Sequence, residues 1–149
     1  MMRSSCVIDT MVLRKANAPL RDAPREGRAF AKRLALLQRI RNDELRVLIS
    51  AKLIAEYRQQ VLAPRNDFVT SFFAILDDTT RCKRNWPPWP GRRKAQQDQC
   101  RFPAEDTHVL RTAFLDDEQS TIFTEEKRML PTDACIHRNF GVHVRDPTK

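Results

Sequence analysis

Hydrophobic residues occur along this chain in two patterns, as short continuous runs and as residues spaced three or four apart. Short apolar runs bounded by polar residues are typical of buried strands. The runs that we predict to be strands lie at residues 6–10, 45–49, 121–124 and 141–144. The first run, Cys6-Val7-Ile8, is followed at once by Asp9, so we place this carboxylate at the carboxyl end of its strand.

Helical spacing dominates between these runs. In the segment Arg28–Asn42 apolar residues recur at intervals of three or four and basic residues fill the other faces, which predicts an amphipathic and strongly basic helix. Two further helices are predicted behind residues that favour helix N-caps, Ser50 and Asn66, with Pro64 ending the first of them. A last apolar stripe of helical spacing begins at Val109.

Two segments show neither pattern and are expected to be loops. One is rich in Pro and Arg and continues from the first strand to about Arg25. The other, at about 80–103, contains Trp86-Pro87-Pro88-Trp89-Pro90-Gly91 and a basic run, and we interpret it as an insertion. The alternation of strands and helices predicts one α/β domain over residues 1–149, in which a mainly parallel sheet of four or five strands lies between two layers of helices.

Composition narrows the class of protein further. Lys and Arg outnumber Asp and Glu by 27 to 19, and the net charge of +8 favours a polyanionic partner such as nucleic acid or an acidic protein surface. The four cysteines are far apart and form no zinc motif, so we expect reduced thiols in a cytosolic protein. No stretch approaches the roughly 18 apolar residues of a membrane span, so no membrane association is expected.

Four carboxylates lie where parallel α/β sheets bind ligands, near the carboxyl ends of strands. Asp9 ends the first strand, Glu56 lies in the helix after the second, Asp106 opens the helix before the strand at 121–124, and Glu126 follows that strand by two residues. Clustered carboxylates repel one another unless a cation compensates them, and oxygen ligands select hard ions. The sequence therefore predicts a site for Mg²⁺ or Mn²⁺.

The residues around these acids resemble the four motifs of the PIN-domain ribonuclease family. Val7–Leu13 is similar to the opening motif, and Ile49–Tyr57 is similar to the second, with a serine six residues before the acid. Asp106–Ala113 resembles the third motif, and Ile122–Glu126 resembles the fourth, in which a Thr precedes the acid by two positions. The order and spacing of the motifs agree over nearly the whole chain.

The resemblance implies a PIN fold and metal-dependent hydrolysis of RNA phosphodiester bonds. For small prokaryotic members it also implies a VapC-like toxin role, with an antitoxin protein as partner and a cytoplasmic location. A homodimer is a further candidate, and the sequence leaves the oligomeric state open. Asp9, Asp106 and Glu126 would bind the metal, and Glu56 would bind it or orient the attacking water. Thr10 and Thr124 are expected to fix the local backbone.

Several positions leave alternatives open. Met11 stands where this family usually has Asn. Glu105 adjoins Asp106 and Glu125 adjoins Glu126, so either member of each pair could be the ligand, although Asp106 has the spacing that the third motif expects. Asp133 could be a further acid near the pocket or a loop residue. The three histidines of the chain show no mutual spacing suited to catalysis or metal binding.

The segment at about 80–103 carries a candidate RNA-binding surface. Trp86 and Trp89 would stack on bases while Arg92, Arg93 and Lys94 meet phosphates, the combination that single-strand binders use. The alternative is a simple connector.

A second function class is a non-catalytic RNA-binding or scaffolding protein with a degenerate PIN fold, but all four positions remain acidic in this chain. A haloacid-dehalogenase phosphatase needs Asp where Met11 stands, and a P-loop needs glycines that this chain lacks.

Overall fold

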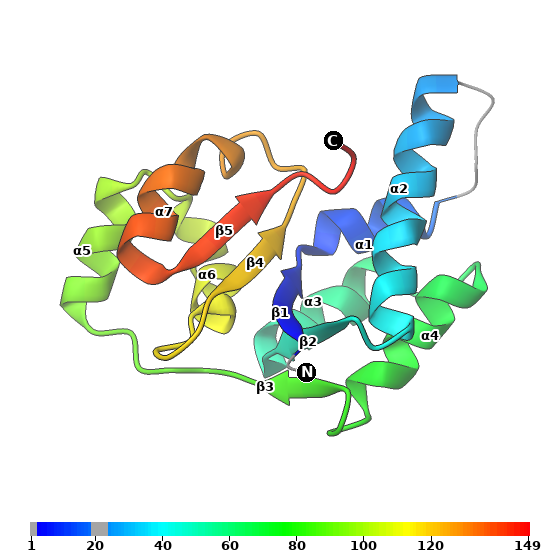
Figure 1. Cartoon of the computed structure of the whole chain (residues 1–149), viewed down its shortest axis with the longest axis horizontal. Coiled ribbons are helices and arrows are strands. Elements are labelled where there is room, and N and C mark those ends of the chain that lie inside the picture. The colour runs from blue at the N-terminus through cyan, green and yellow to red at the C-terminus, as the bar shows by residue number, and fades with distance from the viewer. Residues whose placement is uncertain (1–2, 19–23) are drawn as a thin grey trace.

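The computed structural model describes residues 3–18 and 24–149, which form a five-stranded, all-parallel sheet with helices on both faces (Figure 1). The strands are β1 (Ser4–Ile8), β2 (Leu45–Ile49), β3 (Cys82–Arg84), β4 (Ser120–Phe123) and β5 (Val142–Arg145). The helices are α1 (Thr10–Ala16), α2 (Pro24–Arg41), α3 (Ala51–Gln60), α4 (Asp67–Leu76), α5 (Gly91–Gln99), α6 (Thr107–Ala113) and α7 (Asp133–Phe140), with short 3-10 turns η1 (Ala104–Asp106) and η2 (Leu130–Thr132). The predicted α/β class and parallel sheet are confirmed.

The strand order is β3-β2-β1-β4-β5, so the chain builds one half of the sheet outward from β1 and then returns to build the other half. Right-handed crossovers that run in opposite directions along a sheet lie on opposite faces. The helices between β1 and β3 therefore cover one face, and those between β3 and β5 cover the other. The reversal between β1 and β4 opens a crevice at the carboxyl ends of these two strands, where α/β sheets bind ligands.

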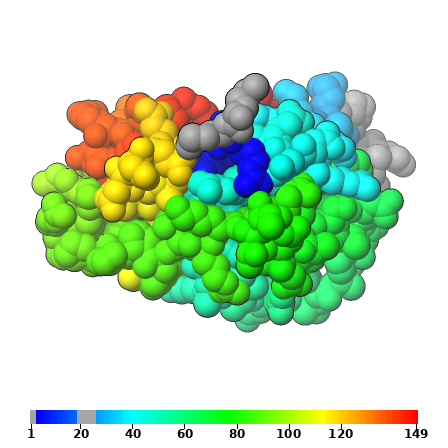
Figure 2. All heavy atoms as spheres, turned by 60° about the horizontal axis from the view of Figure 1, so that its bottom comes forward, coloured from blue at the N-terminus to red at the C-terminus, as the bar shows by residue number. Residues whose placement is uncertain are grey.

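The centre of the sheet is fully buried. Cys6, Val7 and Ile8 of β1 have no exposed surface, as expected for a strand covered on both faces. Figure 2 shows the molecule with the bottom of Figure 1 brought forward, and there the start of β1 (blue) lies between the segment around β2 (cyan) and the residues before β4 (yellow). Within the described part of the chain, no helix is long and apolar enough to cross a membrane.

Both predicted helix caps are confirmed. The Leu53 backbone N–H donates to Ser50 Oγ at 3.4 Å, and the Val69 N–H donates to Asn66 Oδ1 at 2.9 Å. Each bond satisfies an N–H group that the first turn of a helix leaves unpaired. The helix that Ser50 starts ends at Gln60, before the predicted stop at Pro64.

The two segments expected to be loops are partly regular. The first contains α1, which follows Asp9 directly, while its residues 19–23 lie outside the described part of the chain. The segment 80–103 contains the edge strand β3 and the helix α5. These elements lack a hydrophobic pattern for a physical reason: β3 exposes two charged residues, and α5 buries the amide of Gln97, which donates to Thr107 Oγ1 at 2.7 Å. Helix α7 was also not expected.

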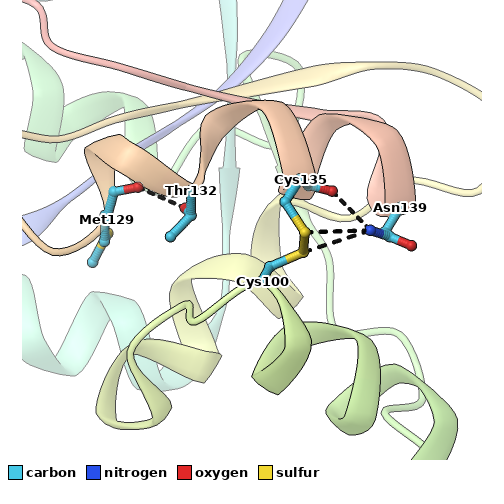
Figure 3. Close-up of a disulfide and its surroundings, with 5 residues drawn as sticks. All are labelled: Cys100, Met129, Thr132, Cys135 and Asn139. Carbon is cyan, nitrogen blue, oxygen red and sulfur yellow. Dashed lines mark hydrogen bonds between the residues drawn. A yellow bond between two sulfur atoms is a disulfide. The ribbon is translucent and has the colours of Figure 1, made fainter.

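A disulfide corrects the prediction of four reduced thiols. Cys100 at the end of α5 is bonded to Cys135 in α7, with Cα atoms 5.5 Å apart (Figure 3). Asn139 Nδ2 lies 3.5 Å from the Cys100 sulfur and 3.6 Å from the Cys135 sulfur. The two cysteines are 35 residues apart, so no local motif marks the pair. Cys6 and Cys82 are free thiols, both buried.

Candidate active site

The four predicted acids line one pocket. Asp9, Glu56, Asp106 and Glu126 surround a cavity of about 230 Å³. They come from the end of β1, from α3, from the start of α6 and from the segment after β4, which are far apart in sequence. The pocket lies at the carboxyl ends of β1 and β4, where the strand order reverses, so the topology itself explains why these side chains meet.

Asp9 is fixed by the strand beside it. Its backbone N–H donates to Phe123 O at 3.0 Å, and Thr124 Oγ1 donates to Asp9 Oδ2 at 2.7 Å. The same threonine hydroxyl accepts a hydrogen bond from the Glu126 N–H at 2.9 Å. The completely buried Thr124 therefore orients one acid and the backbone of another, which is more than the local backbone role expected for it.

Glu56 is held from two sides. Thr10 Oγ1 donates to Glu56 Oε1 at 2.7 Å, and His108 Nε2 lies 2.6 Å from Glu56 Oε2. His108 is only 4% exposed, and the spacing of the three histidines gave no sign of its place beside the pocket, because its partner lies in another helix. Lys52, one turn before Glu56, forms no ion pair with it in the described residues. The carboxylate is thus directed inward instead of pairing along its own helix surface.

Neighbouring contacts distinguish the ambiguous acids. Arg33, which is 3% exposed, donates through Nε and Nη2 to Glu125 at 2.8 Å each, so Glu125 is engaged in an ion pair away from the pocket. Arg128 pairs with both Glu105, at 2.5 Å, and Glu126, at 3.3 Å, but Glu105 does not line the pocket whereas Glu126 does. The geometry therefore favours Glu126 and Asp106 over their sequence neighbours.

The pocket has a strongly negative electrostatic character. Burial, reinforced by the carboxylates of Asp9, Glu105 and Glu126, raises the pKa of Asp106 to about 6. Burial also raises the pKa of Asp9, and the charge of Glu56 adds to this effect, although the hydrogen bond from Thr124 opposes it. Arg14 is the cationic residue among those that line the pocket. The acids therefore repel one another when no further cation is present.

The donor set suits a hard divalent ion. Among residues 3–18 and 24–149, no group of three or more His, Cys, Asp or Glu side chains is placed so that it could hold a metal ion. Mg²⁺ usually retains several waters and is held by one or two carboxylates together with substrate phosphates. The ligands that this chain provides are carboxylate oxygens in an open pocket, which fits such a partly hydrated ion.

The raised pKa of Asp106 predicts a pH dependence of stability. In the folded state the pKa of Asp106 is about 6 instead of its ordinary value of 3.8, so the folded protein binds this proton more tightly than the unfolded chain. Lowering the pH from 7 to 5 in EDTA should therefore stabilise the protein at this site. Asp106→Asn should weaken this pH dependence, whereas Asp116→Asn, an exposed control, should keep it. Parallel pH profiles of melting temperature for wild type and Asp106→Asn would contradict the prediction.

The residues of the candidate RNA-binding surface have different partners. Trp89 stacks on Phe140 with ring centroids 5.5 Å apart, and its Nε1 donates to Gln97 Oε1. The Arg93 guanidinium lies 4.4 Å from the centre of the Phe114 ring, and Lys94 pairs with Asp98 on α5. Arg92 is exposed, and Trp86 is 47% exposed on the other side of the two prolines.

Asp133 has a structural partner. Its Oδ1 accepts from the Val144 N–H at 2.8 Å, and its carboxylate forms an ion pair with Arg145. It does not line the acidic pocket, so it joins α7 to β5 instead.

Comparison with protein-family models, with curated proteins and with solved structures found no match for this chain. Functional inference therefore depends on the geometry of the pocket and on the sequence motifs.

Proposed function

We propose that this protein is a Mg²⁺- or Mn²⁺-dependent endoribonuclease. One observation carries the proposal: four acids that the sequence places in separate motifs line a single pocket at the reversal point of the sheet. Ion pairs account for only part of this arrangement: Glu126 pairs with Arg128 and Glu56 lies against His108, but Asp9 and Asp106 form no ion pair among the described residues. Asp106 also makes no side-chain bond to cap its own helix.

Each acid has a distinct role in this proposal. Asp9 and Asp106 would hold the ion, Glu126 would bind it directly or through water, and Glu56 would orient the attacking water. The bound ion would activate that water and stabilise charge on the scissile phosphate. Thr124 holds Asp9 in place and Thr10 holds Glu56 by hydrogen bonds, so both ends of the pocket are pre-organised.

The toxin role with an antitoxin partner, and the cytoplasmic location that goes with it, belong to the same proposal and depend on the sequence motifs alone. The Cys100–Cys135 disulfide favours a more oxidising location, since such bonds are rare in the cytosol. Induced expression in a bacterial host, with and without a leader that directs the chain to the periplasm, would reveal where it arrests growth.

A second candidate is a non-catalytic RNA-binding or scaffolding protein that has kept the acidic pocket. The observation in its favour is that no group of three or more His, Cys, Asp or Glu side chains in the described residues is placed to hold a metal ion. The two functions differ in a simple measurement, because only the nuclease shortens RNA when Mn²⁺ is added.

The adjacent glutamates provide a matched test of the proposal. Wild type should cleave a mixed RNA in Mn²⁺ and be inactive in EDTA. Glu126→Gln should lower the cleavage rate by at least about 10-fold with little change in stability, because it removes charge next to the proposed ion. Glu125→Gln should retain cleavage but lose about 3 kcal/mol of stability, because it leaves the buried Arg33 guanidinium with only the exposed Glu26 as a charged partner.

Cleavage rates and urea unfolding of the three proteins check this prediction. Absence of cleavage by wild type in Mn²⁺ would support the non-catalytic candidate. Loss of cleavage in the Glu125 variant alone would show that the wrong glutamate is assigned to the site.

A further inference from the structure

A second cavity lies beside the acidic pocket, at the carboxyl ends of β2 and β3. It has a volume of about 560 Å³. Its lining residues are Ile49, Ser50, Ala51, Lys52, Arg84, Asn85 and Trp86. Because β2 pairs with β1 and β3 pairs with β2, this cavity opens at the same edge of the sheet as Asp9.

The indole of Trp86 forms a rigid platform at this cavity. The Arg111 guanidinium lies 4.0 Å from the centre of the Trp86 ring and covers one of its faces, while Arg111 Nε donates to Pro87 O at 2.6 Å. The preceding residue, Asn85, is bound through its Nδ2 to Thr112 O and Phe114 O and through its backbone N–H to Ile49 O. The Trp86 indole is 47% exposed, but contacts of the residues before and after it in the sequence hold it in place.

Two cations stand at the same cavity without acidic partners. Lys52 and Arg84 are exposed and form no ion pair in the described part of the chain. An aromatic face combined with unpaired cations is the chemistry that binds a nucleobase and its phosphate, because every base has a π-face and every phosphate needs a counter-charge.

The two cavities are joined by helix α3. Lys52 lines the cavity at Trp86 and Glu56 lines the acidic pocket, and residues four apart in a helix are separated by about 6 Å along its axis. A stacked nucleic-acid strand advances about 3.4 Å per nucleotide. One strand lying across this edge could therefore occupy both cavities with nucleotides one or two positions apart.

We propose that the cavity formed by Trp86, Lys52 and Arg84 binds one unpaired nucleotide of single-stranded RNA, one or two positions from the phosphate in the acidic pocket. The base stacks on the open face of Trp86, and the two cations contact its phosphates. This subsite rests on the proposed nuclease function for its role in catalysis, but RNA binding to it needs no metal.

Binding in EDTA tests the subsite apart from cleavage. The probe is a fluorescein-labelled, single-stranded oligoribonucleotide of mixed sequence, followed by anisotropy. Trp86→Ala should weaken binding by about 5- to 100-fold, and Trp86→Phe should restore part of the loss because a smaller aromatic face remains. The unlabelled oligonucleotide should quench the fluorescence of wild type but not that of Trp86→Phe, whose remaining indole, Trp89, is packed against Phe140.

A matched pair of charge variants tests the two cations. Lys52→Gln/Arg84→Gln should reduce the slope of log affinity against log salt by about 1.4, the value for two phosphate contacts to a single strand. Arg41→Gln/Arg138→Gln removes the same charge from exposed positions on α2 and α7 and should leave the slope nearly unchanged. Equal slopes for the two variants would overturn the assignment of Lys52 and Arg84.

The outcomes separate this subsite from the nuclease proposal. RNA binding that depends on Trp86, without cleavage in Mn²⁺, would support the subsite and reject the nuclease. Cleavage by a Trp86→Ala variant with unchanged affinity and KM would overturn the subsite and leave the nuclease intact. If polyglutamate displaced the labelled oligonucleotide as strongly as unlabelled RNA does, the cavity would be a general site for acidic protein segments. That result would overturn the proposal that a base stacks on Trp86.

Discussion

Asp9→Asn should abolish RNA cleavage while the fold stays intact. The substitution keeps the size of the side chain and an oxygen that can accept the hydrogen bond from Thr124. It removes the full negative charge of a carboxylate from the proposed ligands of the ion. Changes to groups that only support metal ligands already cost about 10- to 100-fold, so we expect a loss of at least about 100-fold here. Initial cleavage rates on mixed RNA in Mn²⁺ measure this effect.

The effect of Asp9→Asn on thermal stability should differ between the metal-free and the metal-bound protein. Without metal, burial and Glu56 raise the pKa of Asp9, which means that its charged form is disfavoured in the folded state. Neutral Asn removes that cost at pH 7, so the melting temperature in EDTA should stay equal or rise. With Mn²⁺, stabilisation should be smaller than in wild type because the affinity for the ion is lower.

Asp116→Asn is the matched control, since it removes the same charge at an exposed position away from the pocket. It should behave as wild type in both assays. A variant at Asp9 that cleaves as fast as wild type would exclude Asp9 from the reaction. A wild type that neither cleaves nor gains stability with Mn²⁺ would favour the non-catalytic candidate.

Reduction of the Cys100–Cys135 disulfide should lower the free energy of unfolding by about 3 to 4 kcal/mol. The bond closes a segment of 35 residues, and in the chain-entropy model it restricts the unfolded chain by that amount. For a chain of this length the loss corresponds to a fall in melting temperature of about 10 °C. Urea unfolding with and without dithiothreitol, at pH 7, measures it.

The double variant Cys100→Ser/Cys135→Ser provides the control. It should match reduced wild type and be insensitive to dithiothreitol, because the other two cysteines are already thiols and burial raises the pKa of Cys6 to about 12. Equal stability of oxidised and reduced wild type would show that this bond contributes nothing to the fold. Sensitivity of the double variant to the reductant would point to Cys6 or Cys82 instead.

Most of the secondary structure near the site follows from local sequence. A strand covered on both faces needs a continuous apolar run, so Cys6-Val7-Ile8 could be recognised directly. A helix that packs by an apolar stripe shows its period, and a cap such as Ser50 or Asn66 acts on an N–H group three residues away. These are short-range effects, and one sequence contains all the information that they need.

Elements held by polar contacts could not be recognised in this way. Helix α5 buries the amide of Gln97 against Thr107 and Trp89 and has no apolar stripe, so its sequence is typical of a loop. The edge strand β3 is three residues long and exposes two charges, which suits an edge that must not pair further. In both cases the stabilising partner lies elsewhere in the chain.

The sequence by itself determined the α/β class, the buried first strand and the set of acids that line the pocket at its carboxyl end. Only the tertiary structure decided which member of each acidic pair lines the pocket. Glu125 and Glu126 cannot be told apart as candidate ligands from sequence, whereas in the structure Arg33 pairs with Glu125. It also decided the disulfide, the place of His108 beside Glu56 and the packing of Trp89 on Phe140. Each of these depends on the strand order and helix packing that bring distant residues together, which no spacing within one segment encodes.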